Sequence, residues 1–131
     1  MQRNPVGWFE IYVSDMPRAK AFYEAMLGVE LSRLPTPPLE GPPLEMFVFP
    51  GPTGGEGPGC GGALCKMEGC EPGGGGGTLI YFSCADCAVE AERAGANGGQ
   101  VFRPKFAIGE YGFISLIIDS EGNMIGLHSM N

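Results

Sequence analysis

Histidine and basic residues are scarce in this chain of 131 residues. It contains one histidine and eight lysines and arginines against fifteen aspartates and glutamates, which gives a formal net charge of −7. Nucleic-acid backbones and anionic membrane surfaces are bound by concentrated positive charge. The balance therefore argues against nucleic acid and membrane as partners, and it mildly favours a neutral or cationic small molecule as ligand.

Long apolar runs are also missing. No stretch approaches the roughly 18 consecutive apolar residues that cross a bilayer. The N-terminal sequence MQRNPVGW lacks the apolar region of a signal peptide. The length suits a single domain. We therefore expect one domain over residues 1–131 and a cytoplasmic location.

The cysteines do not suggest a disulfide framework. There are five, an odd number, at positions 60, 65, 70, 84 and 87, and a cytoplasmic chain keeps its thiols reduced. Cys84 and Cys87 have the spacing of zinc or redox motifs, but no second pair or nearby histidine completes a tetrahedral site. We interpret Cys84 as a strand residue that faces a helix and Cys87 as part of the first helical turn. A metal or redox role for the pair is the alternative.

Glycine and proline, by contrast, are abundant. Residues 51–77 hold 13 of the 23 glycines, and residues 35–43 hold five prolines. The proline segment predicts an extended surface loop, and the glycines of residues 71–77 predict a flexible linker. A phosphate-binding loop is the alternative for this linker. It lacks the Lys-Ser/Thr that such a loop requires, and a strand follows it instead of a helix.

Residues 7–28 predict a strand and a helix. Alternation over residues 8–13 indicates a strand. Asp15 suits a helix N-cap, Pro17 the first turn and Gly28 the end of the helix. An apolar stripe is expected to pack the helix on the strand: Met16, Ala19, Phe22, Tyr23, Met26 and Leu27.

A second, weaker copy of this unit follows. A shift of 71 residues aligns the first strand with residues 79–84 and Gly28 with Gly99, with a helix over residues 86–96. A shift of 63 aligns GGALCKM, residues 61–67, with the strand at residues 124–130. We interpret this as one module used twice, over residues 1–70 and 78–131, and a chance alignment is the alternative. The remaining strands are expected at residues 29–34, 45–49, 100–103 and 113–118, with a loop or short strand at 105–112 and a turn at 119–122.

Three motifs carry a family resemblance. They are VSDMPRAKAFYEAMLG from Val13, the glycine-rich end of the second helix at residues 94–99, and IIDSEGNMIGLHS near the C-terminus. Together with the repeat they resemble the vicinal oxygen chelate superfamily, which includes glyoxalase I, bleomycin-resistance proteins and extradiol dioxygenases. The resemblance implies an α+β fold in which two βαβββ modules form a U-shaped, mainly antiparallel sheet around a concave cleft. It also implies helices on the outside and a homodimer.

The resemblance further implies where a metal ion would be held. In metal-dependent members the ligands lie on the first and last strands of each module, and these positions correspond to Trp8, Ala63, Leu79 and Gly126. None of these side chains can coordinate a divalent ion. We therefore expect no metal and no cofactor. An ion held elsewhere, by Glu10, His128 and Cys65, is the alternative.

Strand alternation predicts which side chains line the cleft. The catalytic candidates are Glu10, His128 and Tyr81. The expected ligand-binding residues are Trp8, Tyr12, Cys65, Leu79, Ser83 and Tyr111, and Ala63, Met124 and Gly126 fall on the same side. Such an aromatic and apolar lining with few polar groups is typical of a small-molecule pocket.

Each of these candidates has a structural alternative. Glu10 could act as a base or could bind a cationic ligand. Alternatively it forms an ion pair with a lysine or arginine of the chain, or lies at the open rim of the cleft. His128 could act as the acid that partners Glu10; alternatively it is exposed, or its ring is hydrogen-bonded to nearby residues. Trp8 and Tyr81 would stack on a planar ligand or fill space. Tyr111 belongs to a loop that resembles the cleft-covering segment of the family, and Gly109 and Gly112 would let it move.

Three functions are consistent with this pattern. The first is a protein that binds a small organic molecule in its cleft without the usual divalent metal. The second is a metal-independent isomerase or lyase in which Glu10 transfers a proton next to a carbonyl, with Tyr81 or His128 stabilising the oxyanion. The third is an interaction module that dimerises through its exposed sheet edges.

Overall fold

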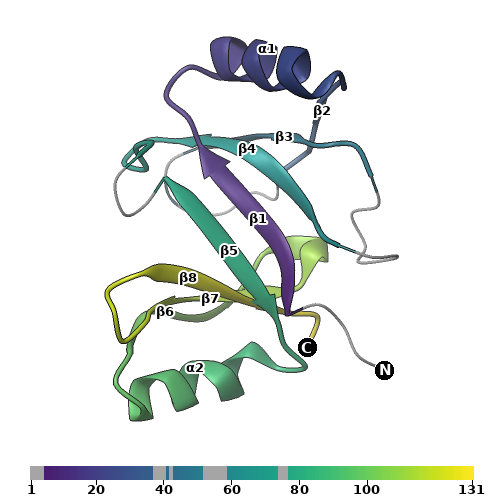
Figure 1. Cartoon of the computed structure of the whole chain (residues 1–131). Coiled ribbons are helices and arrows are strands. Elements are labelled where there is room, and N and C mark those ends of the chain that lie inside the picture. The colour runs from purple at the N-terminus through teal and green to yellow at the C-terminus, as the bar shows by residue number, and fades with distance from the viewer. Residues whose placement is uncertain (1–4, 37–40, 42, 52–58, 74–76) are drawn as a thin grey trace.

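A single mixed sheet of eight strands runs through the molecule, with two α-helices outside it (Figure 1). This computed structural model describes residues 5–36, 41, 43–51, 59–73 and 77–131. The first half contains β1 (Val6–Tyr12), α1 (Met16–Leu27), β2 (Ser32–Arg33), β3 (Leu44–Val48) and β4 (Gly61–Met67). The second half contains β5 (Thr78–Ser83), α2 (Cys87–Ala96), β6 (Gln100–Ala107), the 3-10 helix η1 (Gly109–Tyr111), β7 (Phe113–Ile118) and β8 (Met124–Ser129).

Local sequence signals set the ends of α1 as predicted. The Asp15 side chain accepts a hydrogen bond from the backbone N–H of Arg18 at 3.0 Å, and Pro17 lies in the first turn. Gly28 ends the helix with φ 66°, and its N–H donates to the Glu24 carbonyl. A left-handed residue at this position is accessible to glycine at little cost. Helix α2 begins in the same way, since the Asp86 side chain accepts from the N–H of Ala88 at 3.0 Å.

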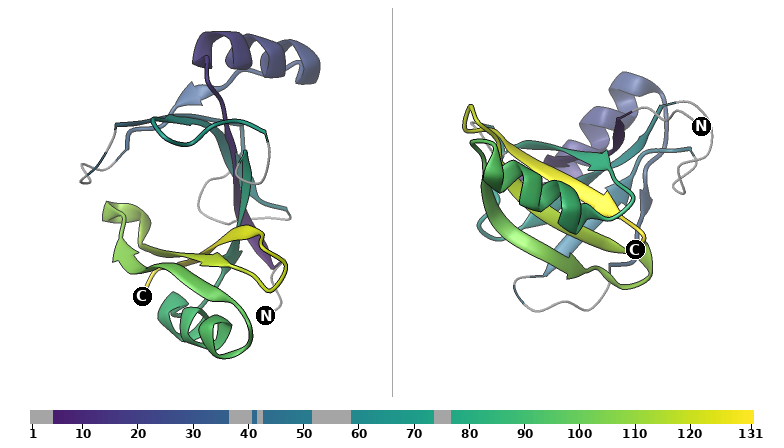
Figure 2. Two further views of the ribbon diagram at one scale, coloured as in Figure 1. Left: turned by 90° about the vertical axis from the view of Figure 1, so that its left-hand side faces the viewer. Right: turned by 90° about the horizontal axis from the view of Figure 1, so that it is seen from below.

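The order of strands repeats on either side of the centre. The sheet runs β2-β3-β4-β1-β5-β8-β7-β6, so each half places its first strand innermost and parallel to its last strand. The antiparallel pair β1 and β5 joins the two halves. Figure 2 shows the sheet bent into a U, with the strands of the two halves facing each other. The predicted α+β class and U-shaped sheet are confirmed.

The two faces of the sheet carry separate hydrophobic clusters. The Glu10 side of β1 faces the inside of the U, and the other side faces the helices. The inner cluster contains Tyr12, Met46, Val48, Ala63, Cys65, Leu79 and Tyr81, with Trp8, Leu34, Leu44, Ile114, Leu116 and Met124 packed against it. The outer clusters contain Val13, Met16, Leu31 and Leu64 under α1, and Cys87, Ala91, Ile117 and Leu127 under α2.

The predicted packing of α1 is wrong in part. Met16 is buried, and Ala19 and Tyr23 are partly buried against the sheet. Phe22, Met26 and Leu27 are 58%, 57% and 53% exposed. The helix contacts the sheet through a narrow stripe, so the flank with Phe22 and Met26 and the last turn with Leu27 remain outside it.

Several element boundaries also differ from the prediction. Strand β2 covers two residues instead of six, because Val29 and Leu31 pack under α1 instead of joining the sheet. Strand β6 continues to Ala107, and η1 occupies the rest of the expected loop. Helix α2 ends at Ala96 as predicted, and the glycine with positive φ after it is Gly98, one residue before the Gly99 that aligns with Gly28.

The cysteines and the linker can be compared with the prediction only in part. All five thiols are free; Cys65 and Cys87 are buried, and Cys87 lies in the first turn of α2 as predicted. Residues 74–76 of the expected linker lie outside the described residues, as does most of the proline-rich loop. Among the helices in the described ranges, none is long and apolar enough to cross a membrane.

Candidate active site

A buried carboxylate lies at the centre of the concave face. Glu10 is 7% exposed and accepts three side-chain hydrogen bonds. Oε1 accepts from the Tyr12 hydroxyl at 2.7 Å and from the Tyr81 hydroxyl at 3.3 Å, and Oε2 accepts from Trp8 Nε1 at 3.2 Å. Strands β1 and β5 supply these residues, so the site spans the junction between the two halves. All three donors were among the predicted cleft residues.

No cation balances this carboxylate within the described residues. The ion pairs found there join other side chains: Lys20 with Glu24, Arg33 with Glu45, and Lys105 with Asp86. Glu10 therefore neither lies at an open rim nor forms one of these pairs, and both structural alternatives for it are wrong here. Burial raises its pKa above the ordinary value of 4.5, and the hydrogen bonds from Tyr12, Trp8 and Tyr81 oppose this only in part.

The groups around Glu10 stay protonated. Burial and the nearby carboxylate raise the pKa of Tyr12, of Tyr81 and of the Cys65 thiol well above their usual ranges. The two phenols therefore act as hydrogen-bond donors at physiological pH. Cys65 lines the site as an uncharged thiol, because burial strongly disfavours the thiolate.

Tyr81 and Glu10 occupy equivalent positions in the two halves. The shift of 71 residues relates them, and β1 and β5 bring them within hydrogen-bonding distance. Glu10 pairs in register with Ala63 of β4, and Tyr81 pairs with Gly126 of β8. The Tyr81 ring lies over Gly126 so closely that a Cβ there would be 2.3 Å from it. Gly126 is therefore required for the ring to reach Glu10.

The residues do not fit the divalent ion that the family resemblance implies. Ala63 is fully buried, Leu79 belongs to the apolar cluster, and the Tyr81 ring covers Gly126. Trp8, at the fourth position, carries no metal-binding atom. In the described part of the chain, no three His, Cys, Asp or Glu residues are placed to hold a metal ion. This includes the alternative set of Glu10, His128 and Cys65.

His128 and Tyr111 lie apart from the carboxylate. His128 Nε2 is 2.6 Å from the Tyr111 carbonyl oxygen, which can only accept, so this nitrogen carries the proton. The Tyr111 hydroxyl donates to the Pro35 carbonyl in the opposite half at 3.1 Å. The two residues therefore form a link between the halves, and none of the hydrogen bonds of Glu10 is to His128. The expectation that His128 is satisfied locally fits this contact.

Ser83 also lies away from Glu10. It is four residues along β5 from Leu79, the residue that pairs with Glu10, and it lies beside His128 in register. A Cβ at Gly7 would come within 2.2 Å of the Ser83 hydroxyl oxygen, so the hydroxyl fills the space beside that glycine. The structure thus brings together Glu10, Trp8, Tyr12, Tyr81, Cys65 and Leu79, and places Ser83, His128 and Tyr111 elsewhere.

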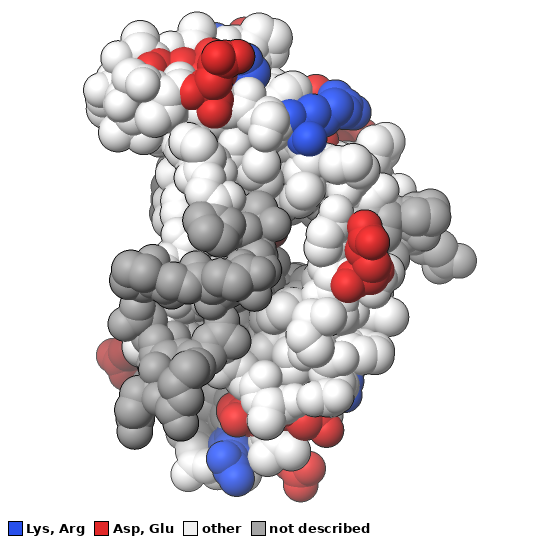
Figure 3. Space-filling view, turned by 90° about the vertical axis from the view of Figure 1, so that its right-hand side faces the viewer, with Lys and Arg blue, Asp and Glu red and all other residues white. Residues whose placement is uncertain are grey.

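Two apolar walls enclose this polar centre. Met46 and Val48 of β3 face it from one side, and Ile114 and Leu116 of β7 from the other. Figure 3 shows the molecule hollowed between its two halves, and most of the described surface around this hollow carries no charge. Apolar walls with a few convergent polar groups suit an uncharged organic molecule.

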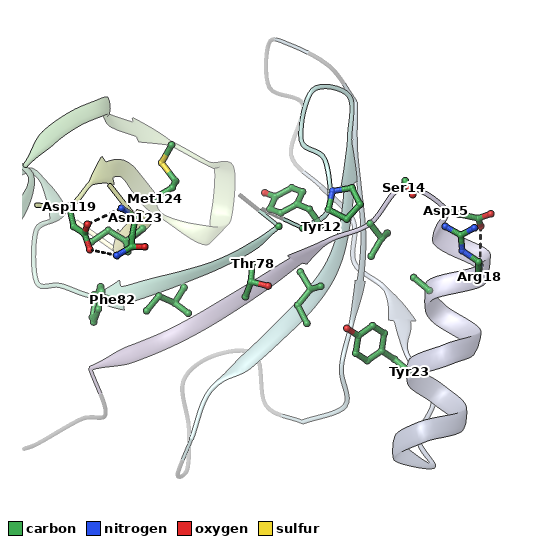
Figure 4. Close-up of a pocket in the computed structure, with 18 residues that line it drawn as sticks. Tyr12, Ser14, Asp15, Arg18, Tyr23, Thr78, Phe82, Asp119, Asn123 and Met124 are labelled. Carbon is green, nitrogen blue, oxygen red and sulfur yellow. Dashed lines mark hydrogen bonds between the residues drawn. The ribbon is translucent and has the colours of Figure 1, made fainter. Parts of the chain in front are cut away.

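A cavity of about 780 Å³ lies on the outer face of β1 and β5. Figure 4 shows Arg18 and Tyr23 of α1 on one side of it and Asp119, Asn123 and Met124 on the other. No sequence motif predicted this groove. Its lining comes from segments far apart in the sequence, and it contains Tyr12 and Met124, which strand alternation assigns to the cleft. The one feature of the sequence that pointed to the groove was strand alternation, which places Ile11 and Ile80 on the side of the sheet that faces the helices.

These features define a class. The chain is an α+β protein of two similar halves, whose joined sheets curve around a buried carboxylate with aromatic donors. A family model described as Glyoxalase/Bleomycin resistance protein/Dioxygenase superfamily matches residues 6–127. The chain therefore belongs to this superfamily, as the motifs predicted. No curated protein sequence matches it significantly.

Solved structures support the fold at low sequence identity. A variant of Streptomyces coelicolor methylmalonyl-CoA epimerase in complex with 2-nitronate-propionyl-CoA is 18% identical, with a TM-score of 0.63 and 98% of each chain covered. Methylmalonyl-CoA epimerase from Mycobacterium tuberculosis is 14% identical, with a TM-score of 0.64 and 97% of this chain and 88% of that one covered. An uncharacterized Methanosarcina mazei protein is 16% identical, with a TM-score of 0.59 and 100% and 95% covered.

Proposed function

We propose that the concave cleft binds a small organic molecule whose polar end lies against Glu10, and that binding needs no divalent metal. The observation that carries this proposal is a buried carboxylate with three aromatic donors and no cation beside it in the described residues. A carboxylate can accept about four hydrogen bonds, and the three aromatic donors leave one acceptor position for a donor of the ligand. The apolar walls supply the remaining contact area.

The single tryptophan makes binding directly measurable. Trp8 donates to Glu10, so a ligand in the cleft changes its fluorescence. The probe is N-phenyl-1-naphthylamine, a neutral aromatic amine with one N–H donor, titrated into protein treated with a chelator. We expect saturable quenching of Trp8. Leu116→Gln in the cleft wall should weaken binding about tenfold, since it removes apolar contact and buries an amide.

Ile80→Gln is the matched control. Ile80 lies on the other face of the sheet and lines the outer groove, so its replacement should leave the affinity unchanged. Loss of affinity in Ile80→Gln but not in Leu116→Gln would place the probe in the outer groove and contradict the proposal. So would binding that requires an added metal ion.

A second candidate function is catalysis by Glu10, as an isomerase or lyase. The raised pKa of Glu10 and the protonated phenols beside it favour this candidate. In an isomerisation, the carboxylate would take a proton from the carbon next to a carbonyl, and the electron pair would move to the carbonyl oxygen. Tyr81 would donate a hydrogen bond to that oxygen, and the same carboxyl would return the proton. His128 is not assigned this role, since its Nε2 faces Tyr111.

Proton exchange separates catalysis from binding alone. Ketones and thioesters with one C–H next to the carbonyl are incubated with the protein in D₂O, and deuterium uptake is followed by NMR. A catalyst should exchange at least one of them. Glu10→Gln should abolish this exchange while sparing the affinity for neutral compounds, and Glu45→Gln on the surface should change neither. Exchange that persists in Glu10→Gln would exclude Glu10 as the base.

We also propose that the chain forms a homodimer through α1. The exposed apolar side chains Phe22, Met26 and Leu27 support this, because clusters of this kind are commonly covered by a partner. Sedimentation should give a dimer, and Phe22→Ser with Met26→Ser should give a monomer. Phe102→Ser, which removes a 61% exposed phenylalanine from β6, is the control and should remain dimeric. The division into modules 1–70 and 78–131 and the cytoplasmic location stay predictions.

A further inference from the structure

An arginine stacked on a phenylalanine stands at the outer edge of the cleft wall. Strand β6 is the last strand of the sheet. Arg103 pairs in register with Leu116 and Phe106 with Ile114, and both partners belong to the inner cluster. Residues that oppose each other in an antiparallel pair point to the same face. Arg103 and Phe106 therefore lie on the concave face.

The neighbouring lysine confirms this assignment of faces. Lys105 Nζ lies 2.9 Å from Asp86, the N-cap of α2, and 4.7 Å from the centre of the Phe113 ring. Asp86 and Phe113 both lie on the helix side of the sheet. Since successive strand residues point to opposite faces, Phe106 points into the U. The register is irregular between Arg103 and Phe106, so Arg103 does not follow Lys105 to the helix side but shares the face of Phe106.

The guanidinium of Arg103 stacks on the Phe106 ring, and no side-chain hydrogen bond or ion pair among the described residues uses its donors. Its central carbon lies 3.6 Å from the centre of the Phe106 ring, so the ring covers one face of the group. Arg103 is exposed, and the ion pairs of the described residues do not include it. A planar guanidinium with its edge open presents paired donors that match a carboxylate, phosphate or sulfonate.

We propose that Arg103 and Phe106 form an anion-binding position at the lip of the cleft, so that the ligand is an amphipathic organic anion. This inference rests on the proposed function of the cleft. The anionic group stays at the lip, where water still reaches it, and an apolar body extends between the walls. The uncharged end points toward Glu10, because that carboxylate repels an anion in the desolvated centre.

The size of the ligand follows from the sheet. Four strand spacings separate β1 from β6, which is roughly 19 Å along the curved surface. Because the sheet is bent into a U, this length is an upper limit for the distance that a molecule touching both ends must span (Figure 2). A smaller anion with an aromatic body is expected to bind at the lip and the apolar walls without reaching Glu10.

Two fluorescent probes test the anion-binding position. N-phenyl-1-naphthylamine is neutral, and 8-anilinonaphthalene-1-sulfonate has the same aromatic framework with a sulfonate added. We expect Arg103→Gln to weaken binding of the sulfonate probe about three- to tenfold, as for the loss of an exposed charge-assisted contact. Binding of the neutral probe should not change. Added salt should weaken the sulfonate probe in the wild type and much less in Arg103→Gln.

Arg93→Gln is the matched control. It removes the same charge from the exposed surface of α2. An equal effect of Arg93→Gln would mean that the probe responds to total charge, and equal weakening of both probes by Arg103→Gln would mean a structural defect; either result overturns the inference. It also falls if Arg103→Gln changes nothing, or if wild-type protein binds neither probe.

The two proposals fail in different ways. If the neutral probe quenches Trp8 but Arg103→Gln leaves the ratio of the two affinities unchanged, the cleft function stands and the anion-binding position is wrong. If the sulfonate probe depends on Arg103 while neither probe affects Trp8, the lip binds anions and the proposed role of the Glu10 centre is wrong.

Discussion

At the scale of single residues, the site depends on a carboxylate that folding has removed from water. Three donors converge on Glu10, but they are neutral groups. Their hydrogen bonds recover part of the solvation that the charged form loses, and the pKa stays raised. Such a group is costly for stability at neutral pH, which is the usual sign of a functional position.

Ionisation of the buried Glu10 should destabilise the folded protein, and this should appear as a pH dependence of the free energy of unfolding. The folded protein keeps a proton that the unfolded chain releases above pH 4.5, so stability falls as the pH rises from 4.5 through the folded-state pKa. Glu10→Gln removes this dependence. The free energy of unfolding of the variant minus that of the wild type should therefore increase with pH, by about 1.4 kcal/mol for each unit of pKa shift.

Urea unfolding from about pH 4.5 to about pH 8 measures this difference. Glu45→Gln, at an exposed position paired with Arg33, serves as the control and should show little pH dependence. A difference between Glu10→Gln and wild type that stays constant or decreases with pH would mean that the pKa of Glu10 is not raised.

Gly126 is the second residue whose role can be tested alone. A Cβ at this position would approach the Tyr81 ring to 2.3 Å. Gly126→Ala should therefore lower the free energy of unfolding by about 1–3 kcal/mol. Gly95→Ala is the contrasting control, because the space there is open to 3.8 Å, and the same change should stabilise α2 by about 0.5–1 kcal/mol.

A double variant identifies the cause of the Gly126 effect. If the clash is with Tyr81, then Gly126→Ala should cost less in a Tyr81→Leu background, as a coupling between contacting residues requires. Thermal or urea unfolding of the four proteins gives the coupling energy. Strictly additive effects would show that Gly126 matters for some reason other than the position of the ring.

At the scale of elements, α1 is held to the sheet by few side chains. Met16 is 3% exposed, whereas Met26 in the last turn is 57% exposed. Met16→Ala should cost about 2–5 kcal/mol in the free energy of unfolding, because it empties a packed position. Met26→Ala should stay within about 0.5 kcal/mol in the monomer.

Unfolding at low protein concentration checks this contrast. The comparison uses one residue type in one helix, so helix propensity cancels between the two variants. A large loss for Met26→Ala at every concentration would mean that the helix packs differently. A loss that appears only at high concentration would instead support the dimer through α1.

At the scale of the whole molecule, the two halves are joined at the base of the U and again at its mouth. The base is the β1–β5 pair. At the mouth, the Tyr111 hydroxyl donates a hydrogen bond to the Pro35 carbonyl, and His128 Nε2 donates one to the Tyr111 carbonyl. Tyr111→Phe removes only the bond across the mouth, so we expect a loss of about 0.5–1 kcal/mol in the free energy of unfolding.

The same variant should change how a ligand enters. Opening the mouth breaks the Tyr111 bond, so N-phenyl-1-naphthylamine should associate faster with Tyr111→Phe, as stopped-flow quenching of Trp8 would measure. Tyr23→Phe removes a phenol on the outer face and should not alter the rate. Equal rates in all three proteins would show that this bond does not control access.

The sequence by itself determined the helices, most strands and the side that the residues of β1, β4, β5 and β8 face. Asp15, Gly28 and Asp86 act through contacts within a few residues, and strand alternation places Glu10 with Trp8 and Tyr12 whatever surrounds them. The motifs and the repeat also gave the family. These features could be predicted because each depends on local geometry or on a pattern that recurs along the chain.

Only the tertiary structure decided how those side chains are used. The absence of a cation beside Glu10 in the described residues, the Tyr81 ring over Gly126 and the exposed Phe22 depend on neighbours distant in sequence. The outer groove and the contact of His128 with Tyr111 do so as well. A strand pattern gives the direction of a side chain, but burial and partners follow from which strands lie adjacent and how closely a helix approaches the sheet.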